Sequence, residues 1–250
     1  MSTEIQDSKL VIQITDLKKS YGDNHVLDGF NMNLYEGENV VVMGKSGSGK
    51  SVMIKCLIGL EAPDNGSIMV MGKNINELGQ DELDELRTEI GFLFQGSALY
   101  DSMSVRENLE FPLRRHTKKF GFVKDTTKLV MEALENVGLT HAIDLMPSEL
   151  SGGMKRRVAL ARTLILQPKI ILYDEPTTGL DPITAKEIIL LMLSIQKKYN
   201  TSSIIITHDV DCARVIANRM ILLVDGINYA EGTFNELSNA TDAKVCAFFK

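Results

Sequence analysis

The sequence predicts an α/β fold in which helices cover a mainly parallel β-sheet. Short apolar runs alternate with helical patterns from about residue 150 to residue 226, strand-like segments and turns occupy the first 75 residues, and residues 96–148 are patterned as helices. Apolar strands that alternate with helices are typical of a parallel sheet that is covered on both faces. We therefore expect a single domain over residues 1–250, with a core at about 8–95 and 165–250 and an inserted helical subdomain at about 96–164.

The N-terminal part of the core is expected to be an antiparallel β region. The segment "LVIQITDL", which begins at Leu10, alternates between apolar and polar residues as a half-buried strand does. Strand-like segments follow at Val26–Leu34 and Asn39–Met43, and the turn residues of Glu36–Asn39 separate them. Two turn dipeptides in "EAPDNGSI" predict a β-hairpin within the segment "DNGSIMVMGK", residues 64–73.

The remaining elements follow from apolar periodicity and from residues that begin helices. A helix is expected from Gly49 to about Leu60, and a short strand at Ile90–Gln95. Pro182 stands at a favoured first-turn position of a long helix, and Ser151 is a good N-cap for a helix that continues from Met154. The other predicted elements are a helix at Asp125–Val137 and strands at 169–174, Ser203–Thr207 and Met220–Gly226.

The composition limits the classes of function that the chain can have. The net charge is −6, whereas a protein that binds nucleic acid usually presents a basic face, so nucleic acid is not an expected partner. The N-terminus "MSTEIQDSK" lacks the apolar run of a signal peptide, and the apolar run Ile188–Ile195 is much shorter than the roughly 18 residues of a membrane span. We expect a cytosolic chain that reaches any membrane through a partner.

A phosphate-binding loop lies between a predicted strand and a predicted helix. The segment "GKSGSGKS" has the pattern G-x-x-x-x-G-K-S and follows the apolar strand "NVVVM". In such a loop, backbone N–H groups surround the phosphates of a nucleotide, the lysine reaches the β- and γ-phosphates, and the serine binds Mg²⁺. The residues that we assign to nucleotide binding are Gly44, Lys45, Ser46, Gly47, Ser48, Gly49, Lys50 and Ser51. The predicted fold class is therefore α/β, with a P-loop NTPase (RecA-like) core, an N-terminal antiparallel β region and an inserted helical subdomain.

Two more apolar strands end in residues suited to phosphate chemistry. "IILYDEP" places Asp174 and Glu175 at the end of a strand, and buried strands seldom end in two carboxylates without a cation or a proton to handle. We expect Asp174 to hold Mg²⁺ and Glu175 to be the general base for the attacking water. His208 ends a further strand. Alone it would be assigned a structural hydrogen bond, but beside a P-loop it is expected to contact the γ-phosphate or the attacking water.

The segment "ELSGGMKRRVALAR", residues 149–162, raises a separate question. Gly152 and Gly153 stand where a helix begins after Ser151, and glycine in a first turn is unfavourable for backbone entropy. Bare backbone N–H groups at a helix N-terminus are suited to bind phosphate. Yet the chain already contains a phosphate loop about a hundred residues earlier.

Taken together, these motifs resemble those of the ATP-binding cassette (ABC) ATPases, because "LSGG" separates that family from other P-loop proteins. The resemblance covers almost the whole chain, with the motifs in the family's order. It implies that Tyr21 in "KKSYGD" stacks on adenine, and that Gln95 in "FLFQGS" touches Mg²⁺ or the attacking water and links the site to the helical subdomain. The segment "TTGLD" ends at Asp181, the position of the family's D-loop. Without the other motifs, Tyr21 would be an ordinary surface aromatic and Gln95 an ordinary polar strand end.

The resemblance also answers the question of the second phosphate site. In this family two chains pair head to tail, and Ser151, Gly152 and Gly153 of one chain face the γ-phosphate held by the P-loop of the other. The hydroxyl, the backbone N–H groups and the helix dipole then close the site when ATP bridges the two chains. We therefore expect a homodimer that uses ATP and Mg²⁺.

One departure from the family pattern points to a subfamily. Most members carry Gln after "LSGG", whereas this chain has Met154, followed by a basic run. That run and the segment Gly96–Lys118 resemble the ATPases of bacterial lipid-trafficking systems of the Mla/Mkl type, which serve Mce-domain transporters. The resemblance implies an ATPase that drives phospholipid or another hydrophobic cargo through a separate integral-membrane permease. It further implies an Mce-domain lipid-binding subunit and a peripheral location at the cytoplasmic face of the inner membrane.

Two other functions compete with lipid transport. ATPases of polar-solute importers, such as those for amino acids, share "SV-x-EN" with this chain, although their "LSGGQ" signature is absent. Non-transport ABC ATPases act on DNA or ribosomes. The DNA-repair members insert a long coiled coil between the P-loop and the signature, where this chain has only about a hundred residues without sustained heptads, and the ribosomal members usually carry two cassettes.

Overall fold

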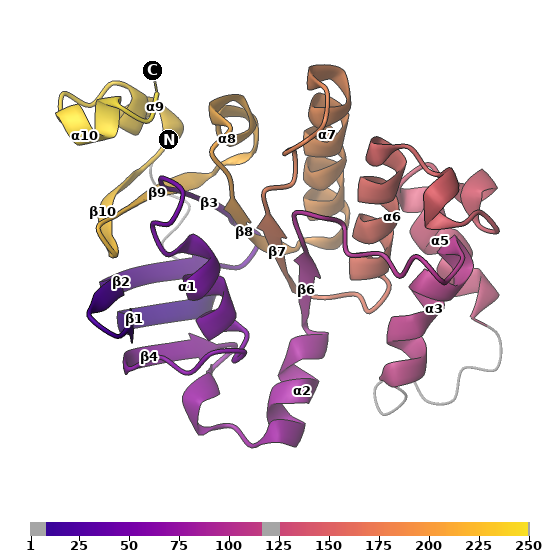
Figure 1. The fold of residues 1–250 in the computed structure, drawn as a ribbon, viewed down its shortest axis with the longest axis horizontal. Coiled ribbons are helices and arrows are strands. Elements are labelled where there is room, and N and C mark those ends of the chain that lie inside the picture. Colours follow the sequence, from indigo (N-terminus) through magenta and orange to yellow (C-terminus); the bar gives the residue numbers. More distant parts are fainter. Residues whose placement is uncertain (1–8, 117–125, 250) are drawn as a thin grey trace.

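The computed structural model describes residues 9–116 and 126–249, which form two β-sheets with helices around them (Figure 1). The smaller sheet has four antiparallel strands in the order β2-β1-β4-β5. Its strands are β1 (Leu10–Tyr21), β2 (Asn24–Tyr35), β4 (Asn65–Val70) and β5 (Lys73–Asn74). The predicted antiparallel region is therefore present, and it lies beside the larger sheet in the lower left of Figure 1.

The predicted hairpin is present, but its turn is not at the asparagine-glycine pair. Asn65 opens β4 and pairs with Lys18 of β1, so the dipeptide 65–66 lies within the sheet. The turn between β4 and β5 is formed by Met71 and Gly72, with φ values of 50° and 80°. Two positive φ values are those of the type I′ hairpin turn, which follows the twist of the strands. Pairing with β1 thus took precedence over the local turn preference.

The larger sheet has six strands in the order β10-β9-β3-β8-β7-β6. All neighbours are parallel except β10, which is antiparallel to β9. The strands are β3 (Asn39–Met43), β6 (Ile90–Leu93), β7 (Ile170–Asp174), β8 (Ser202–Ile206), β9 (Arg219–Val224) and β10 (Ile227–Gly232). The mainly parallel sheet that the sequence predicts is confirmed.

The central strands are buried on both faces, which explains their continuous apolar sequences. Every residue of β3 and of β8 is buried. Along β3, Val41 and Met43 pack into one hydrophobic cluster while Val40 and Val42 pack into another. This alternation follows the two-residue period of a strand and places one cluster on each face of the sheet.

The helices differ from the predicted ones mainly at their ends. They are α1 (Lys50–Leu57), α2 (Gln80–Thr88), α3 (Val105–Arg115), α5 (Thr127–Asn136), α6 (Gly152–Leu164), α7 (Pro182–Tyr199), α8 (Val210–Ile216), α9 (Phe234–Ser238) and α10 (Ala243–Cys246). The helix α1 ends at Leu57, before the predicted Leu60, because Gly59 adopts a φ of 65° that a helix does not continue through. The helix α6 begins at Gly152, so both glycines are helical.

The helices α3, α5 and α6 lie together at the right of Figure 1, next to the β6 end of the larger sheet. Their buried faces share one hydrophobic cluster, to which α3 contributes Val105 and Leu109, α5 contributes Leu134, and α6 contributes Val158. The same cluster continues to Val41 of the central strand β3. The helical part is therefore packed onto one continuous core. In the described part of the chain, no helix combines the length and the apolarity that crossing a membrane requires.

Candidate functional site

Three parallel strands end at the same edge of the larger sheet. The strand β3 leads into the loop 44–49, β7 ends at Asp174, and β8 leads to His208. Backbone hydrogen bonds join these ends, because Glu175 N donates to Ile206 O at 2.9 Å and Thr207 N donates to Val42 O at 3.4 Å. The carboxyl ends of parallel strands are where ligands bind in open α/β sheets. The structure thus brings together the P-loop, both carboxylates and the histidine.

Three glycines of the P-loop occupy places that a larger residue could not. Gly47 and Gly49 have φ values of 79° and 100°, which only glycine adopts without strain. A Cβ atom on Gly49 would lie 2.8 Å from Val26 O, and one on Gly44 would lie 2.4 Å from Ser48 Oγ. The backbone is therefore bare where phosphates are expected to approach. Ser48 Oγ is buried and has no hydrogen-bond partner in the described structure, as fits a loop built to receive a ligand.

The ammonium group of Lys50 lies within this loop. Its Nζ donates to Gly44 O at 2.8 Å and to Lys45 O at 2.9 Å. Burial lowers the pKa of Lys50, while the negative charges of Glu175 and Asp174 act in the opposite direction. The cation is thus held at the P-loop and near the two carboxylates, where the β- and γ-phosphates would lie.

The oxygen ligands at this edge fit Mg²⁺. Asp174 is half-buried at the end of β7, and Ser51 is exposed in the first turn of α1. Burial and the neighbouring Glu175 raise the pKa of Asp174, and the cations of Lys50 and Arg156 oppose this. The residues described contain no cluster of three or more His, Cys, Asp or Glu side chains that could hold a metal. Mg²⁺ is usually bound by one or two protein groups together with substrate phosphates and water, which this donor set allows.

Glu175 is fixed by several contacts around its side chain. His208 Nδ1 lies 2.9 Å from its carboxylate, and Thr178 Oγ1 donates to Oε2 at 3.1 Å. The φ of Glu175 is 48°, in the left-handed region, which costs a non-glycine residue about 1–3 kcal/mol. Such a conformation persists only where surrounding contacts determine it. Its side chain is largely buried and that of His208 is exposed, so the pair lies where the site opens to solvent.

Gln95 lies in the turn that follows β6, and its side chain is exposed. Asp181 lies after the turn 175–180 and is the N-cap of α7, where its carboxylate accepts from Ile183 N at 3.1 Å and from Thr184 N at 3.0 Å. Gln95 therefore stands on the segment that continues from β6, and Asp181 stands on the segment that continues from Glu175. In the described part of the chain, neither side chain forms a hydrogen bond with the P-loop.

Tyr21 ends β1, and 48% of its surface is exposed. Its hydroxyl donates to Glu61, whose Oε1 atom accepts from Lys55 Nζ at 2.9 Å. The hydrogen bond to Glu61 is the main reason why the pKa of Tyr21 is raised to about 12. Lys19 Nζ lies 5.6 Å from the ring centroid. The ring is thus held at its hydroxyl end and remains accessible to a planar ligand.

The two glycines at the start of α6 serve different purposes. Ser151 is the N-cap, and its hydroxyl accepts from Met154 N at 3.2 Å. A Cβ atom on Gly153 would lie 2.6 Å from Thr184 Cγ2, so α6 and α7 approach each other too closely for a larger residue. A Cβ atom on Gly152 would meet only Leu180 Cδ2, at 3.9 Å. Among the described residues, no contact therefore requires glycine at position 152.

The helices α1 and α6 stand in different parts of the molecule, α1 beside the antiparallel sheet and α6 among the helices on the other side of β6 and β7 (Figure 1). The two helix N-termini that the sequence predicts to bind phosphate are therefore separate within one chain.

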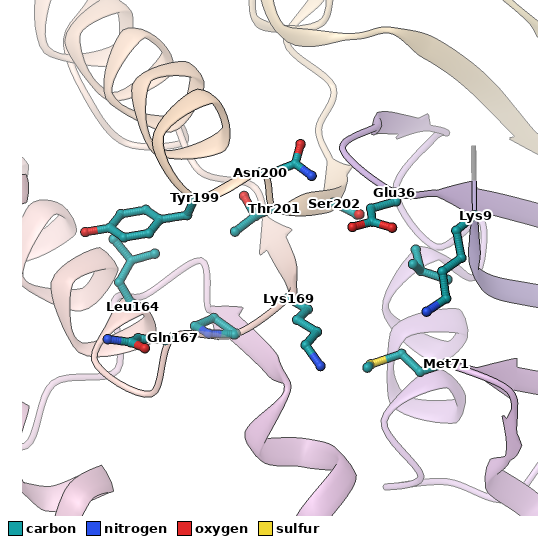
Figure 2. Close-up of a pocket in the computed structure, with 12 residues that line it drawn as sticks. Lys9, Glu36, Met71, Leu164, Gln167, Lys169, Tyr199, Asn200, Thr201 and Ser202 are labelled. Carbon is teal, nitrogen blue, oxygen red and sulfur yellow. The ribbon is translucent and has the colours of Figure 1, made fainter. Parts of the chain in front are cut away.

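A pocket elsewhere in the structure includes neither of these helix N-termini. It lies before the first residues of β7 and β8, at the strand ends opposite the P-loop, and its lining includes Lys9, Glu36, Lys169 and Asn200 (Figure 2).

Sequence patterns did not identify three residues that support this site. Thr178 binds the Glu175 carboxylate, and Glu61 binds Tyr21. Arg156 of α6 donates to the backbone carbonyls of Phe94, directly before Gln95, and of Glu175. Thr178 belongs to the segment "TTGLD", whose resemblance to the family pattern was a signal that could have identified it. Glu61 and Arg156 are common charged residues without a sequence pattern of their own. Only the folded chain shows that Glu61 binds the Tyr21 hydroxyl and that Arg156 is buried.

Comparison with known proteins gives one family. Residues 27–178 match the model of the ABC transporter family. A dimeric ATP-binding cassette solved in a post-hydrolysis state with ADP and Pi superimposes with a TM-score of 0.80 and 34% sequence identity. That likeness covers 89% of this chain and 98% of the solved chain.

Relatives of known name include proteins of three descriptions. An intermembrane phospholipid transport system ATP-binding protein, MlaF of Haemophilus influenzae, is 38% identical over 96% of this chain and 90% of its own length. A probable ribonucleotide transport ATP-binding protein, mkl of Mycobacterium leprae, is 42% identical over 86% of this chain, which spans only 61% of that relative. A methionine import ATP-binding protein, MetN of Clostridium tetani, is 40% identical over 86% of this chain and 67% of its own length. The chain therefore belongs to the ABC transporter family and is an ABC-type ATPase.

Proposed function

We propose that this chain is the ATPase subunit of a bacterial transporter for phospholipid or another hydrophobic cargo. The observation that carries the lipid assignment is the likeness to MlaF of Haemophilus influenzae, which extends over 96% of this chain and 90% of the relative. Met154, which stands where most family members have Gln, supports it. The half-buried Met154 side chain packs against the chain's own hydrophobic cluster, so it leaves the backbone N–H groups of Gly152 and Gly153 free to bind phosphate.

The chemistry that we propose is attack of water on the γ-phosphorus of ATP. The oxygen of water forms the new bond to phosphorus, the bond to the bridging β–γ oxygen breaks, and ADP and phosphate leave. Glu175 orients this water and accepts its proton, and His208 holds the carboxylate and faces the γ-phosphate. Lys50 and the backbone N–H groups of the P-loop stabilise the phosphate charges. Mg²⁺, held by Ser51 and Asp174 with Gln95 nearby, would neutralise charge on the β- and γ-phosphates.

A second chain would complete each site. In the proposed homodimer, Ser151, Gly152 and Gly153 of one chain bind the γ-phosphate above the P-loop of the other. Gly152 supports this arrangement, because no contact with the residues that the structure describes explains a glycine there. ATP then acts as the bridge between the chains, and hydrolysis separates them.

The surface that we assign to the permease is an aromatic groove between β6, α3 and α6. Its lining includes Phe92, Phe94, Tyr100, Phe111 and Pro112. The rings of Tyr100 and Phe111 lie 4.8 Å apart, and Phe94 and Tyr100 are 45% and 43% exposed. Exposed aromatic side chains that line one groove are typical of a protein–protein contact. Phe94 directly precedes Gln95, so a permease segment in this groove would touch the loop that leads to the ATP site.

The proposed assembly contains two ATPase chains, an integral-membrane permease and an Mce-domain lipid-binding subunit. It would place this chain at the cytoplasmic face of the inner membrane. One observation favours a second function, import of a polar solute of the amino-acid type. MetN of Clostridium tetani is 40% identical over 86% of this chain, which is close to the value for MlaF.

Purification of the tagged chain from native membranes in mild detergent tests the proposal, with mass spectrometry of the proteins and lipids that accompany it. A permease together with an Mce-domain subunit and enriched phospholipid would establish lipid transport. A permease with a solute-binding protein and no enriched lipid would establish the importer instead. Absence of any membrane protein would contradict a role in transport.

The aromatic groove can be tested in the same preparation. Replacement of Phe111 by Glu places a charge among the aromatic side chains and is expected to release the permease, because a buried unpaired charge is strongly unfavourable. The matched control is Val215→Glu on α8, where the side chain is 52% exposed and lies outside the groove. Retention of the permease by both variants would place the contact elsewhere.

A further inference from the structure

Arg156 is a buried cation whose hydrogen bonds go to backbone carbonyl groups. It lies in α6, its relative exposure is 3%, and no ion pair among the described residues includes it. Its Nε atom is buried and has no hydrogen-bond partner there. Arginine is seldom fully buried unless it is paired, and each buried unpaired donor lowers stability. Packing alone therefore does not explain this side chain, while Lys155 and Arg157 beside it reach the surface to a greater extent.

The guanidinium of Arg156 reaches two strand ends at once. The NH1 group donates to Phe94 O at 2.7 Å, directly before Gln95. The NH2 group lies 3.5 Å from Glu175 O and 3.4 Å from Thr178 O. One planar group thus joins α6 to the loop after β6 and to the turn after β7, and its five N–H donors in a rigid fork suit several acceptors.

The helix α6 connects Arg156 directly to the signature segment, Ser151–Gly153. Arg156 stands three residues after Gly153 on the same helix, about one turn away, so movement of the helix N-terminus moves the guanidinium as well. At the ATP site, the backbone of Glu175 has an unusual φ of 48°. Its carbonyl oxygen accepts from Arg156, and its N–H donates to Ile206 O. The side chain therefore connects the helix N-terminus to the backbone that aims the Glu175 carboxylate.

We propose that Arg156 is a positioning residue that couples the signature segment of a chain to Glu175 and Gln95 of that chain's own ATP site. The inference rests on the proposed function, in which the signature segment binds the nucleotide of the partner chain. When the signature segment of a chain binds the partner's nucleotide, Arg156 sets the positions of Glu175 and Gln95 in that chain's own ATP site. It does so through the backbone carbonyls and does not contact ATP.

The test compares three variants of the full-length chain. Arg156→Gln removes the charge and keeps one donor for Phe94 O, and Arg156→Lys keeps the charge but lacks the planar fork. The matched control is Arg157→Gln, the same change one residue further along α6, where the side chain instead donates to Val137 O and pairs with Glu187. For each variant we would measure kcat and KM for ATP, ATP-dependent dimerisation, and the thermal midpoint.

If Arg156 positions the site, Arg156→Gln lowers kcat by about tenfold or more while KM for ATP stays within about threefold, because displaced catalytic groups slow the chemical step. Dimerisation with ATP, measured in the Glu175→Gln background, is retained because Ser151, Gly152 and Gly153 are intact. Arg156→Lys is intermediate, and Arg157→Gln resembles the unchanged chain.

Equal turnover in Arg156→Gln and Arg157→Gln would overturn the proposal. So would joint loss of dimerisation, ATP binding and thermal stability in both Arg156 variants, since that pattern describes a structural role alone. Failure of the proposed function is distinguishable from either result. In that case the unchanged chain would hydrolyse no ATP, or Glu175→Gln would hydrolyse it as fast as the unchanged chain.

Discussion

The imidazole Nδ1 of His208 lies 2.9 Å from a carboxylate oxygen of Glu175, although the two residues stand 33 positions apart. The parallel pairing of β7 with β8 makes this contact possible, because Asp174 and Ile206 are direct partners in the sheet. The pairing of the two strands thus brings Glu175 and His208 together. Thr178 holds the second carboxylate oxygen from the turn that follows.

Glu175→Gln is expected to lower the rate of ATP hydrolysis by about 10²–10⁴-fold, because the amide keeps the size of the side chain but cannot accept the proton of water. ATP binding should be unchanged, so the variant should accumulate as an ATP-bound dimer. Phosphate release and size-exclusion chromatography with ATP measure the two effects. The control is Glu132→Gln on the exposed face of α5. Hydrolysis at the normal rate by Glu175→Gln would assign the base elsewhere.

Tyr21→Ala is expected to weaken ATP binding by about 1–3 kcal/mol, the range measured for stacking of a base on an aromatic side chain. Tyr21→Phe keeps the ring and loses only the hydroxyl that donates to Glu61, so its loss of affinity should be clearly smaller. Titration calorimetry with a non-hydrolysable ATP analogue measures both. Equal affinities for Tyr21→Ala and the unchanged chain would show that the ring does not contact the base.

The two glycines of the signature segment should respond differently to alanine. Gly153→Ala is expected to lower the thermal midpoint, because its Cβ atom would lie 2.6 Å from Thr184 Cγ2. Gly152→Ala should keep the normal midpoint, because its Cβ atom would meet only Leu180, at 3.9 Å. It should nevertheless weaken ATP-dependent dimerisation, measured by ultracentrifugation in the Glu175→Gln background. Normal dimerisation of Gly152→Ala would remove the main structural support for phosphate binding in trans.

Carboxylates at helix N-termini predict acid sensitivity. A hydrogen bond from Ser104 N–H lowers the pKa of Glu107, and hydrogen bonds at the first turn of α7 from the Thr184 side chain and backbone lower that of Asp181. The same holds for Glu236, through Thr233, and for Asp242, through the N–H of Val245. In each case the unfolded chain binds protons more readily than the folded chain. The stabilisation is complete above the unfolded pKa values, 4.5 for Glu and 3.8 for Asp, and is lost as the pH falls through the lower folded values.

Denaturant midpoints should therefore be nearly constant from about pH 6 to pH 5 and should fall as the pH is lowered further, to about pH 3. Asp174 contributes in the opposite direction, because its raised pKa favours the protonated folded state. Glu107→Gln should reduce the slope, because the neutral side chain has no proton to bind, and Glu132→Gln on an exposed helix face serves as its control. A midpoint that is constant over this range would show that the capping carboxylates do not stabilise the fold.

Local patterns in the sequence were sufficient for the elements that carry the chemistry. The continuous apolar strands, the P-loop glycines and the polar residues at strand ends can be recognised from their neighbours along the chain. The structure places the P-loop and the polar ends of β7 and β8 at one edge of the sheet. Sequence patterns did not predict helix α2, because "QDELDELRT" has only two apolar residues, Leu83 and Leu86, both of which are buried. The sequence predicted the β4–β5 hairpin without a position for its turn. The strongest turn signal in that segment, Asn65-Gly66, lies within the sheet instead.

The sequence by itself thus determined the parallel core, the phosphate loop and the residue types of the site, because backbone geometry and strand burial constrain those residues locally. Only the tertiary structure decided that Arg156 is buried whereas Arg157 pairs with Glu187, since three consecutive basic residues look alike until the helix packs. It also decided that Thr184 leaves no room for a Cβ atom on Gly153, whereas a Cβ atom on Gly152 would make only an ordinary contact with Leu180. These distinctions depend on contacts between distant segments, which exist only once the helices have been packed against the sheet.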